Sequence, residues 1–222
     1  MASLCIIPAR GGSKRIPKKN IKPFFGKPII AYAIGTALES GLFDEVMVST
    51  DDVDIRAIAL KYGAKVPIMR SVNNSNDKAT LADVVDEVLE FYKGIFDIGC
   101  CLLPTAVLST TSQLDQALTL LKNGDFDSVR PIVKFSYPIQ RAFSLSEKGQ
   151  VEWFYQDNEY LRTQDMKPAY HDAGQFYWFK GDVGLRSKNR GAIVIKESET
   201  HDIDNEEDWK MAEIKYKLIK AD

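Results

Sequence analysis

The stretch LCIIPARGGSKRIPKKN, residues 4–20, decides the fold and carries the first functional signal. Its opening apolar run, Leu4 to Ile7, predicts a buried strand. The run leads into a turn where Gly11 and Gly12 let the backbone bend sharply and bring its N–H groups close to a ligand. Such a turn at the carboxyl end of a strand favours binding of a polyphosphate over an ordinary solvated loop. Basic side chains surround it, at Arg10, Lys14, Arg15, Lys18 and Lys19.

Apolar and amphipathic runs alternate along residues 4–133, in the rhythm of an α/β protein. This alternation predicts a mostly parallel sheet with helices on both faces. Ligands in such sheets bind at the carboxyl ends of the strands, where the basic turn, Thr50-Asp51 and Pro104-Thr105 are expected to lie. Strands are expected at 4–7, 45–49, 65–68, 98–103, 128–133 and 192–196, and helices at 28–40, 53–62, 81–92, 113–122 and 206–219.

Composition limits the classes of function. With 222 residues, the chain is long enough for one well-buried α/β domain. A net charge of -2 argues against a general nucleic-acid surface, and no apolar stretch is long enough to span a membrane. The three cysteines, Cys5, Cys100 and Cys101, show no metal-binding spacing. Buried free thiols are expected, which fits a reducing cytoplasm.

The alternation of strands and helices breaks at about residues 134–168, a stretch that is aromatic and polar. Short runs such as 151–155 are consistent with β-hairpins. Two interpretations remain open, an ordinary β excursion that covers one edge of the sheet and an interface, which aromatic and arginine enrichment favours. The aromatic residues are Phe135, Tyr137, Phe143, Trp153, Phe154, Tyr155 and Tyr160.

Residues 8–20 resemble the opening motif of the acylneuraminate cytidylyltransferases, enzymes that activate nine-carbon sugar acids with CTP. The resemblance continues through 48–51, Arg70 and 103–105 and ends near 202–204, so it covers almost the whole chain. It implies one Rossmann-like, three-layer nucleotidyltransferase domain over residues 1–222. It also implies that an inserted β-rich arm at 134–170 packs on a partner in a homodimer and reaches toward its active site.

The resemblance assigns roles in nucleotide binding. It implies that Arg10, Ser13 and Lys14 contact the triphosphate, and that Asn20 contacts the nucleotide. Arg10 and Lys14 are also the catalytic candidates, because the negative charge that develops in nucleotidyl transfer needs cations. Residues around Arg70 and 77–80 are implied in the cytosine and ribose pocket, although a surface salt bridge and a helix N-cap remain competing interpretations. The expected nucleotide-binding set is Arg10, Gly11, Gly12, Ser13, Lys14, Asn20, Arg70, Asp77 and Thr80.

Asp202 and Asp204 are the metal-ligand candidates, and Mg²⁺ is the expected ion. In an extended segment, side chains two residues apart point the same way, so the two carboxylates make a plausible clamp of hard oxygen ligands. Capping of the following helix is the alternative, and from the residues alone it is favoured. The resemblance reverses that preference, because the family has a metal-binding Asp-x-Asp at this place.

A sugar acid needs a cation for its carboxylate, and arginine binds carboxylates in a bidentate manner. Arg141 and Arg162 are the candidates, and one of them could come from a partner subunit. Leu103 and Ala173 stand where relatives that activate sialic acid carry polar residues, so the pocket suits a more apolar sugar. The expected substrate-binding set is Thr105, Gln140, Arg141, Arg162, Tyr170, His171 and Gln175.

Within the family, residues 137–142 and 170–178 are most similar to the members that activate pseudaminic acid. The expected reaction is therefore attack of the anomeric hydroxyl of that acid on the α-phosphate of CTP, with release of pyrophosphate, in the service of flagellin glycosylation. Sialic or legionaminic acid is the alternative substrate. The rivals from other classes are a catalytically inactive nucleotide-binding protein and a structural protein whose basic turn binds a phosphorylated partner.

Overall fold

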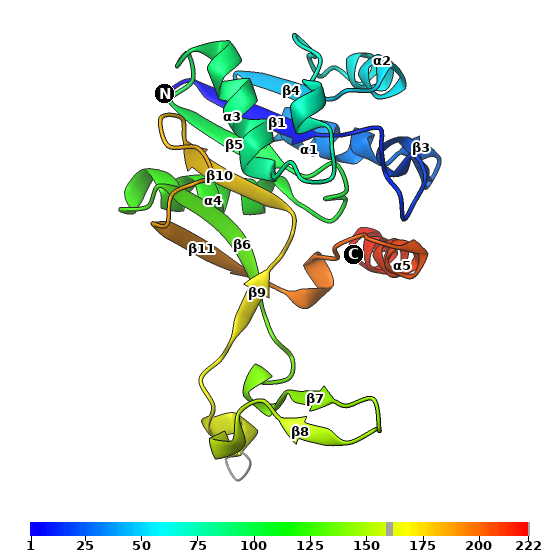
Figure 1. Ribbon diagram of the computed structural model, residues 1–222. Coiled ribbons are helices and arrows are strands. Elements are labelled where there is room, and N and C mark those ends of the chain that lie inside the picture. The colour runs from blue at the N-terminus through cyan, green and yellow to red at the C-terminus, as the bar shows by residue number, and fades with distance from the viewer. Residues whose placement is uncertain (159–161, 222) are drawn as a thin grey trace.

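A computed structural model describes residues 1–158 and 162–221, so Tyr160 lies outside the described residues. A seven-stranded sheet forms the centre of the body, and helices cover both of its faces (Figure 1). The strands lie in the order β11 (Arg190–Ile195), β6 (Ser128–Lys134), β10 (Phe176–Lys180), β5 (Ile98–Leu102), β1 (Ser3–Pro8) and β4 (Glu45–Ser49), with β9 (Tyr170–Asp172) paired to β6.

The predicted mostly parallel sheet is confirmed, with one addition. β1 pairs in parallel with β4 and β5, and β11 pairs in parallel with β6. β10 lies between β5 and β6 and is antiparallel to both, and β9 is antiparallel to β6. β10 had no counterpart among the strands expected from the sequence.

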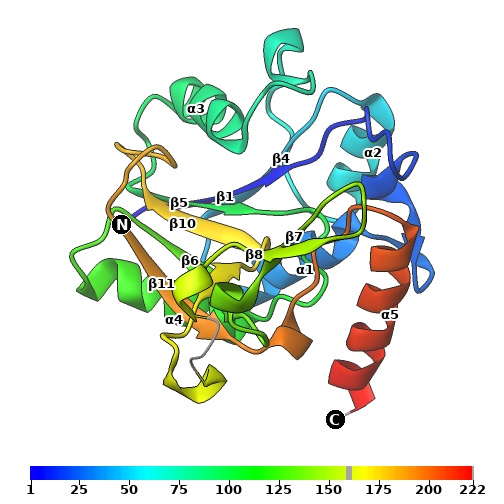
Figure 2. The same ribbon diagram turned by 60° about the horizontal axis from the view of Figure 1, so that its bottom comes forward.

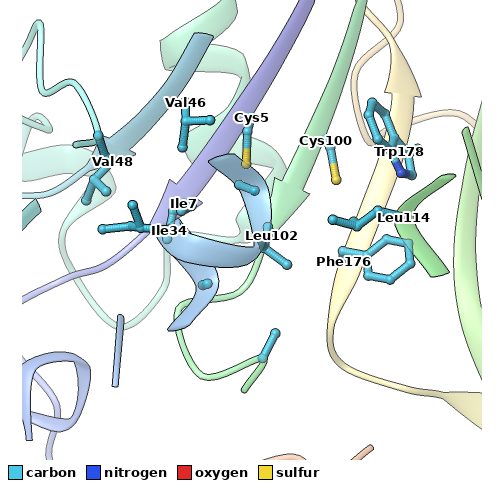
Figure 3. Packing of buried hydrophobic residues seen from close by; sticks show 14 of the residues in the cluster. Cys5, Ile7, Ile34, Val46, Val48, Cys100, Leu102, Leu114, Phe176 and Trp178 are labelled. Atoms are coloured by element: carbon cyan, nitrogen blue, oxygen red, sulfur yellow. The ribbon is translucent and has the colours of Figure 1, made fainter. Parts of the chain in front are cut away.

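Strand β1 shows why the sheet needs helices on both sides. Its side chains alternate between the two faces, because successive residues of a strand point in opposite directions. Cys5 and Ile7 join a buried cluster with α1 (Ile30–Ser40), α2 (Val53–Lys61) and α4 (Thr111–Asn123), part of which is drawn in Figure 3. Leu4 and Ile6 pack on the opposite face against α3 (Leu81–Tyr92). All three cysteines are free and buried, as expected.

Two boundaries predicted from the sequence are wrong. α1 begins at Ile30 rather than Pro28, because Pro28 belongs to a small hairpin of β2 (Pro23–Phe24) and β3 (Lys27–Pro28). The expected strand at 65–68 is a single bridge between Lys65 and Met47. Pro67 has no N–H to donate to β4, so the ladder stops after Lys65.

The helix starts follow local signals that the sequence carries. Asp52 caps α2 by accepting hydrogen bonds from the backbone N–H groups of residues 54 and 55. Thr80 caps α3 in a capping box with Asp83, and Thr110 caps α4 with Gln113 in the same way. Asn205 caps α5 (Glu206–Ala221) by accepting hydrogen bonds from the backbone N–H groups of residues 207 and 208.

Residues 134–170 form an arm that projects from the body (Figure 1). Its outer part is the hairpin of β7 (Phe143–Leu145) and β8 (Val151–Trp153), with short 3-10 turns at Ile139–Arg141, Gln156–Asn158 and Thr163–Asp165. The chain returns to the sheet through β9. Apart from this strand, the arm extends outward and does not run along the edge of the sheet.

The C-terminal segment brings residues 202–204 to the basic turn. After the 3-10 turn Glu197–Glu199, the buried Ile203 and two α5 residues, Trp209 and Ala212, pack against Ile16 and Phe24. Figure 2 shows α5 beside the elements that follow the basic turn. Two further 3-10 turns occur at Lys19–Ile21 and Val72–Asn74.

Among the helices of residues 1–158 and 162–221, none is long and apolar enough to cross a membrane.

Candidate active site

The basic turn that follows β1 closes on an acidic residue from a different part of the chain. Arg10 donates a 2.8 Å hydrogen bond through Nη1 to Oδ1 of Asp77, and Lys14 Nζ pairs with the other oxygen of the same carboxylate. These two contacts, first the bond from Lys14 and then the bond from Arg10, lower the pKa of Asp77. Two cations thus converge on one anionic group at the carboxyl end of β1.

The backbone of the turn is held against the loop after β4. Gly11 donates its N–H to Oδ1 of Asp51 over 2.9 Å. A Cβ at position 11 would lie 2.5 Å from Oδ2 of Asp52, so only glycine fits between the turn and the cap of α2. In this structure the Gly11 amide is therefore engaged by protein. Gly12, in contrast, faces open space, since a Cβ there would meet nothing within 4 Å.

Asn20 holds the backbone of the turn by a side-chain hydrogen bond. Its side chain is buried and donates a 2.9 Å hydrogen bond through Nδ2 to the carbonyl oxygen of Arg10. The sequence analysis expected Asn20 to contact the nucleotide. In this structure the amide fixes the backbone from which the Arg10 side chain extends.

Arg70 is buried and only 7% exposed, so the surface salt-bridge interpretation is wrong. Its Nε donates a 3.0 Å hydrogen bond to Oγ of Ser49, and Nη2 donates to the carbonyl oxygen of the same residue. Desolvation lowers the pKa of the guanidinium. Together with Arg10, Asp77 and Thr80, Arg70 lines a cavity of about 250 Å³ at the N-terminus of α3. Thr80 both caps α3 and faces this cavity.

The acidic pair Asp202 and Asp204 lies on the other side of the basic turn. Arg15 donates to Oδ1 of Asp204 over 2.7 Å, and Lys19 Nζ lies 3.8 Å from the same oxygen. Since Asn205 caps α5, the alternative that the two aspartates merely cap this helix is wrong. Desolvation by the surrounding protein, followed by repulsion from Asp204, raises the pKa of Asp202.

The residues of this pair fit a magnesium ion. Carboxylate oxygens are hard ligands, and a divalent cation would relieve the repulsion by Asp204 that, after desolvation, raises the pKa of Asp202. In the part of the chain that the structure describes, no group of three or more His, Cys, Asp and Glu residues could hold a metal. In proteins, Mg²⁺ commonly takes one or two carboxylates and completes its coordination with water and substrate phosphates.

The residues expected to bind the sugar acid fall into two groups. Thr105 and Gln175 are buried in the body, where Gln175 donates through Nε2 to the carbonyl oxygen of Glu199 over 2.7 Å. Tyr170 and His171 lie on β9, at the root of the arm. The remaining residues lie in the arm itself and contact other arm residues, as Gln140 does with the carbonyl oxygen of Lys167, Arg141 with the ring of Trp153 and Arg162 with Asp165.

A further group was missed in the sequence. Arg130 of β6 pairs with Asp172, and both contact Tyr177 of β10. An arginine in the middle of the otherwise apolar run 128–133 was the available signal. The arginine alone did not indicate which residues would surround it, because the strands that carry Asp172 and Tyr177 come from much later in the chain.

Comparisons with known proteins show which family this chain resembles. Residues 4–219 match the family described as Cytidylyltransferase. The pseudaminic acid cytidylyltransferase of Campylobacter jejuni is 44% identical over 98% of this chain and 97% of its own length. The CMP-N,N'-diacetyllegionaminic acid synthase of Legionella pneumophila is 30% identical over 96% of this chain and 95% of its own length.

Among solved structures, a CMP:2-keto-3-deoxy-manno-octonic acid synthetase complexed with CTP superposes with a TM-score of 0.70, covering 100% of both chains at 18% identity. At that identity the likeness supports the fold, the Rossmann-like α/β arrangement expected from the sequence. The family match over almost the whole length and the identity to the Campylobacter jejuni enzyme support the chemistry as well. The chain therefore belongs to the cytidylyltransferase family.

Proposed function

We propose that this protein transfers a cytidylyl group from CTP to pseudaminic acid and releases pyrophosphate. The observation that carries the proposal is the convergence of Arg10 and Lys14 on the single carboxylate of Asp77, which marks a site prepared for an anionic group. The 44% identity to a pseudaminic acid cytidylyltransferase supports the choice of sugar acid.

The basic turn supplies the electrostatics of the reaction. The anomeric hydroxyl of the sugar acid attacks the α-phosphorus of CTP, the bond from this phosphorus to the bridging oxygen breaks, and pyrophosphate leaves with the bonding electrons. Negative charge grows on the phosphate oxygens, and Arg10 and Lys14 stabilise it from fixed positions. The proton of the hydroxyl passes to water or to a phosphate oxygen.

Asp202 and Asp204 are the proposed holders of Mg²⁺. The bound ion would supply neutralisation of the phosphate charge. The pair lies next to the turn, since Arg15 and Lys19 contact Asp204. Through these contacts, the turn proposed to receive the triphosphate also holds the Asp204 carboxylate in place.

We propose that Leu103 and Ala173 form an apolar wall of the sugar pocket, which favours a deoxy, diacetamido sugar. Ala173 is buried against Val133 and Ile195, and Leu103 packs partly into the clusters on both faces of the sheet. An apolar wall offers no hydrogen bonds to a polar glycerol tail such as that of sialic acid. It can instead pack against a methyl group, and burial of one such group is worth about 0.8 kcal/mol.

We further propose that the protein is a homodimer that forms through the arm. Large apolar side chains are exposed there, with Tyr137 at 83%, Leu145 at 72%, and Val151 and Phe154 at 63%. Exposed apolar side chains gathered on a projecting segment are typical of an interface. In such a dimer the arm residues Gln140, Arg141 and Arg162 would serve the partner's site.

The free, buried thiols fit a reducing compartment such as the cytoplasm.

The test is pyrophosphate release by the purified protein with CTP and Mg²⁺, with pseudaminic, sialic and legionaminic acids offered in parallel. We expect release with pseudaminic acid at a kcat/KM at least about tenfold above that with the other two, a difference of about 1.4 kcal/mol in transition-state binding. A preference for another acid would overturn the proposed substrate. If none of the three acids gave pyrophosphate release, in a protein that still binds CTP, the proposed reaction would be overturned and a nucleotide-binding protein would be favoured.

A further inference from the structure

Arg130, Asp172 and Tyr177 form a charged network at the root of the arm. Arg130 donates a 2.9 Å hydrogen bond through Nη1 to Oδ2 of Asp172, and its guanidinium lies 4.9 Å from the centre of the Tyr177 ring. The hydroxyl of Tyr177 donates to Oδ1 of Asp172 over 3.0 Å. One carboxylate is thus held from two sides, by a cation and by a phenol.

The three residues come from three adjacent strands. Arg130 lies on β6, between the part of this strand that pairs with β10, which carries Tyr177, and the part that pairs with β9, which carries Asp172. Asp172 is the last residue of β9, where the chain of the arm re-enters the sheet (Figure 1). The network therefore sits where the arm joins the body.

Asp172 also holds the turn that follows it. Its Oδ1 accepts a 2.8 Å hydrogen bond from the N–H of Gly174, which has a positive φ of 63°. The carbonyl oxygen of Ala173 accepts a 2.7 Å bond from Thr200 Oγ1, so the turn is tied to the segment before Asp202. A Cβ at position 174 would lie 3.6 Å from Cγ of Asp202, so the turn and the acidic pair are in near contact.

The chemistry of Arg130 argues for more than packing. Its Nε is buried and has no hydrogen-bond partner in the part of the chain that the structure describes. A buried polar atom without a partner is unfavourable, so packing alone does not account for an arginine at this place. Arginine is useful here because its flat guanidinium can pair with a carboxylate and stack on a ring at the same time.

We propose that Arg130 is a positioning residue for the sugar acid, an inference that rests on the proposed function. By orienting Asp172, it holds the turn 172–174 against Asp202, and this turn carries Ala173 of the proposed sugar wall. The nucleotide residues Arg10, Lys14 and Arg70 lie outside this network. Loss of Arg130 therefore impairs the use of the sugar acid and leaves CTP binding in the absence of Mg²⁺ intact.

The experiment compares Arg130→Met with the control Lys180→Met. Lys180 of β10 forms a 3.1 Å ion pair with Asp127, the residue just before β6, near the opposite end of these strands. The two variants remove ion pairs of the same kind from neighbouring strands of the same sheet. A displaced substrate group costs about 10- to 100-fold in rate. We expect a loss of that size in kcat/KM for the sugar acid with Arg130→Met, an unchanged Kd for CTP measured without Mg²⁺, and near-normal kinetics with Lys180→Met.

Arg130→Lys is the conservative variant. It keeps the charge near Asp172 but loses the flat guanidinium, so we expect it to be more active than Arg130→Met and less active than the wild type. Normal kinetics of Arg130→Met, an equal loss in Lys180→Met, or a parallel loss of CTP affinity would each overturn the inference. The last two outcomes would show general loosening of the sheet.

A second measurement does not depend on catalysis. Exchange of the Gly174 amide with deuterated solvent reports on its bond to Asp172. We expect faster exchange in Arg130→Met than in the wild type and in Lys180→Met, and unchanged exchange would overturn the inference. If the wild-type protein turned over no sugar acid, the proposed function would fail, while the Gly174 exchange would still show whether Arg130 holds the turn.

Discussion

Arg10 and Asp77, 67 residues apart in the sequence, form a 2.8 Å ion pair, and Lys14 completes it from the other side of the carboxylate. The two cations that the proposed reaction needs for a triphosphate are thus occupied by a protein carboxylate. If these cations bind the triphosphate as proposed, an entering nucleotide must displace Asp77 from them. We therefore expect the side chain of Asp77 to compete with the phosphate.

Replacing Asp77 should therefore strengthen nucleotide binding. Exposed ion pairs are weak, so Asp77→Asn is expected to lower the Kd for CTP about 2- to 10-fold, as measured by isothermal titration calorimetry. Asp54→Asn is the control, because Asp54 pairs with Lys18 in the same region. Weaker CTP binding by Asp77→Asn would instead show that this carboxylate contacts the nucleotide.

Lys14→Met should abolish most of the turnover. Removal of one group that stabilises transition-state charge typically costs about 10²- to 10³-fold in kcat. Lys18→Met is the matched control, since Lys18 belongs to the same turn but pairs with Asp54 on α2. Steady-state pyrophosphate release measures both variants, and equal losses in the two would show that only the net charge of the turn matters.

Asp202→Asn is expected to preserve the stability of the fold while impairing the Mg²⁺-dependent activity. Because desolvation and Asp204 raise the pKa of Asp202, the folded state favours the protonated form, and the ionised carboxylate destabilises the fold as pH rises. We expect the variant to unfold at the same or a higher temperature at pH 7 without Mg²⁺, and to need more Mg²⁺ for turnover. Glu206→Gln, which removes the partner of Lys22, is the control. An unchanged Mg²⁺ requirement would exclude Asp202 as a ligand.

The capping box of α3 predicts a stability that depends on pH. Hydrogen bonds from the backbone and hydroxyl of Thr80, followed by Arg186, lower the pKa of Asp83 to about 2. The stability that Asp83 contributes is complete above its usual pKa near 3.8 and is lost as pH falls through about 2. The melting temperatures of wild type and Asp83→Asn should therefore differ at pH 6 and converge near pH 2.

Asp86→Asn is the control for that experiment. Asp86 lies on the same helix and pairs with the same Arg186, but it takes no part in the capping box. A pH profile of Asp86→Asn identical to that of Asp83→Asn would show that the pairing with Arg186, and not the cap, produces the effect.

Much of this architecture was predictable because its signals are local. The apolar run 4–7 and the alternation of strands and helices predicted the sheet, and the caps at Asp52 and Asn205 each rest on a single local side chain. The bridge at Lys65 shows the limit of this approach, since the expected strand 65–68 contains Pro67, whose missing N–H mattered only once β4 lay beside it.

By itself, the sequence determined the buried strand β1, the glycine-rich basic turn after it and the helices around the sheet, because periodicity and capping act over a few residues. Only the tertiary structure decided which charges meet. It inserted β10 between β5 and β6, joined Arg15 to Asp204 across 189 residues and joined Arg130 to Asp172 across 42. Such contacts arise when strands and loops distant in sequence pack together, and no short stretch of the chain encodes them.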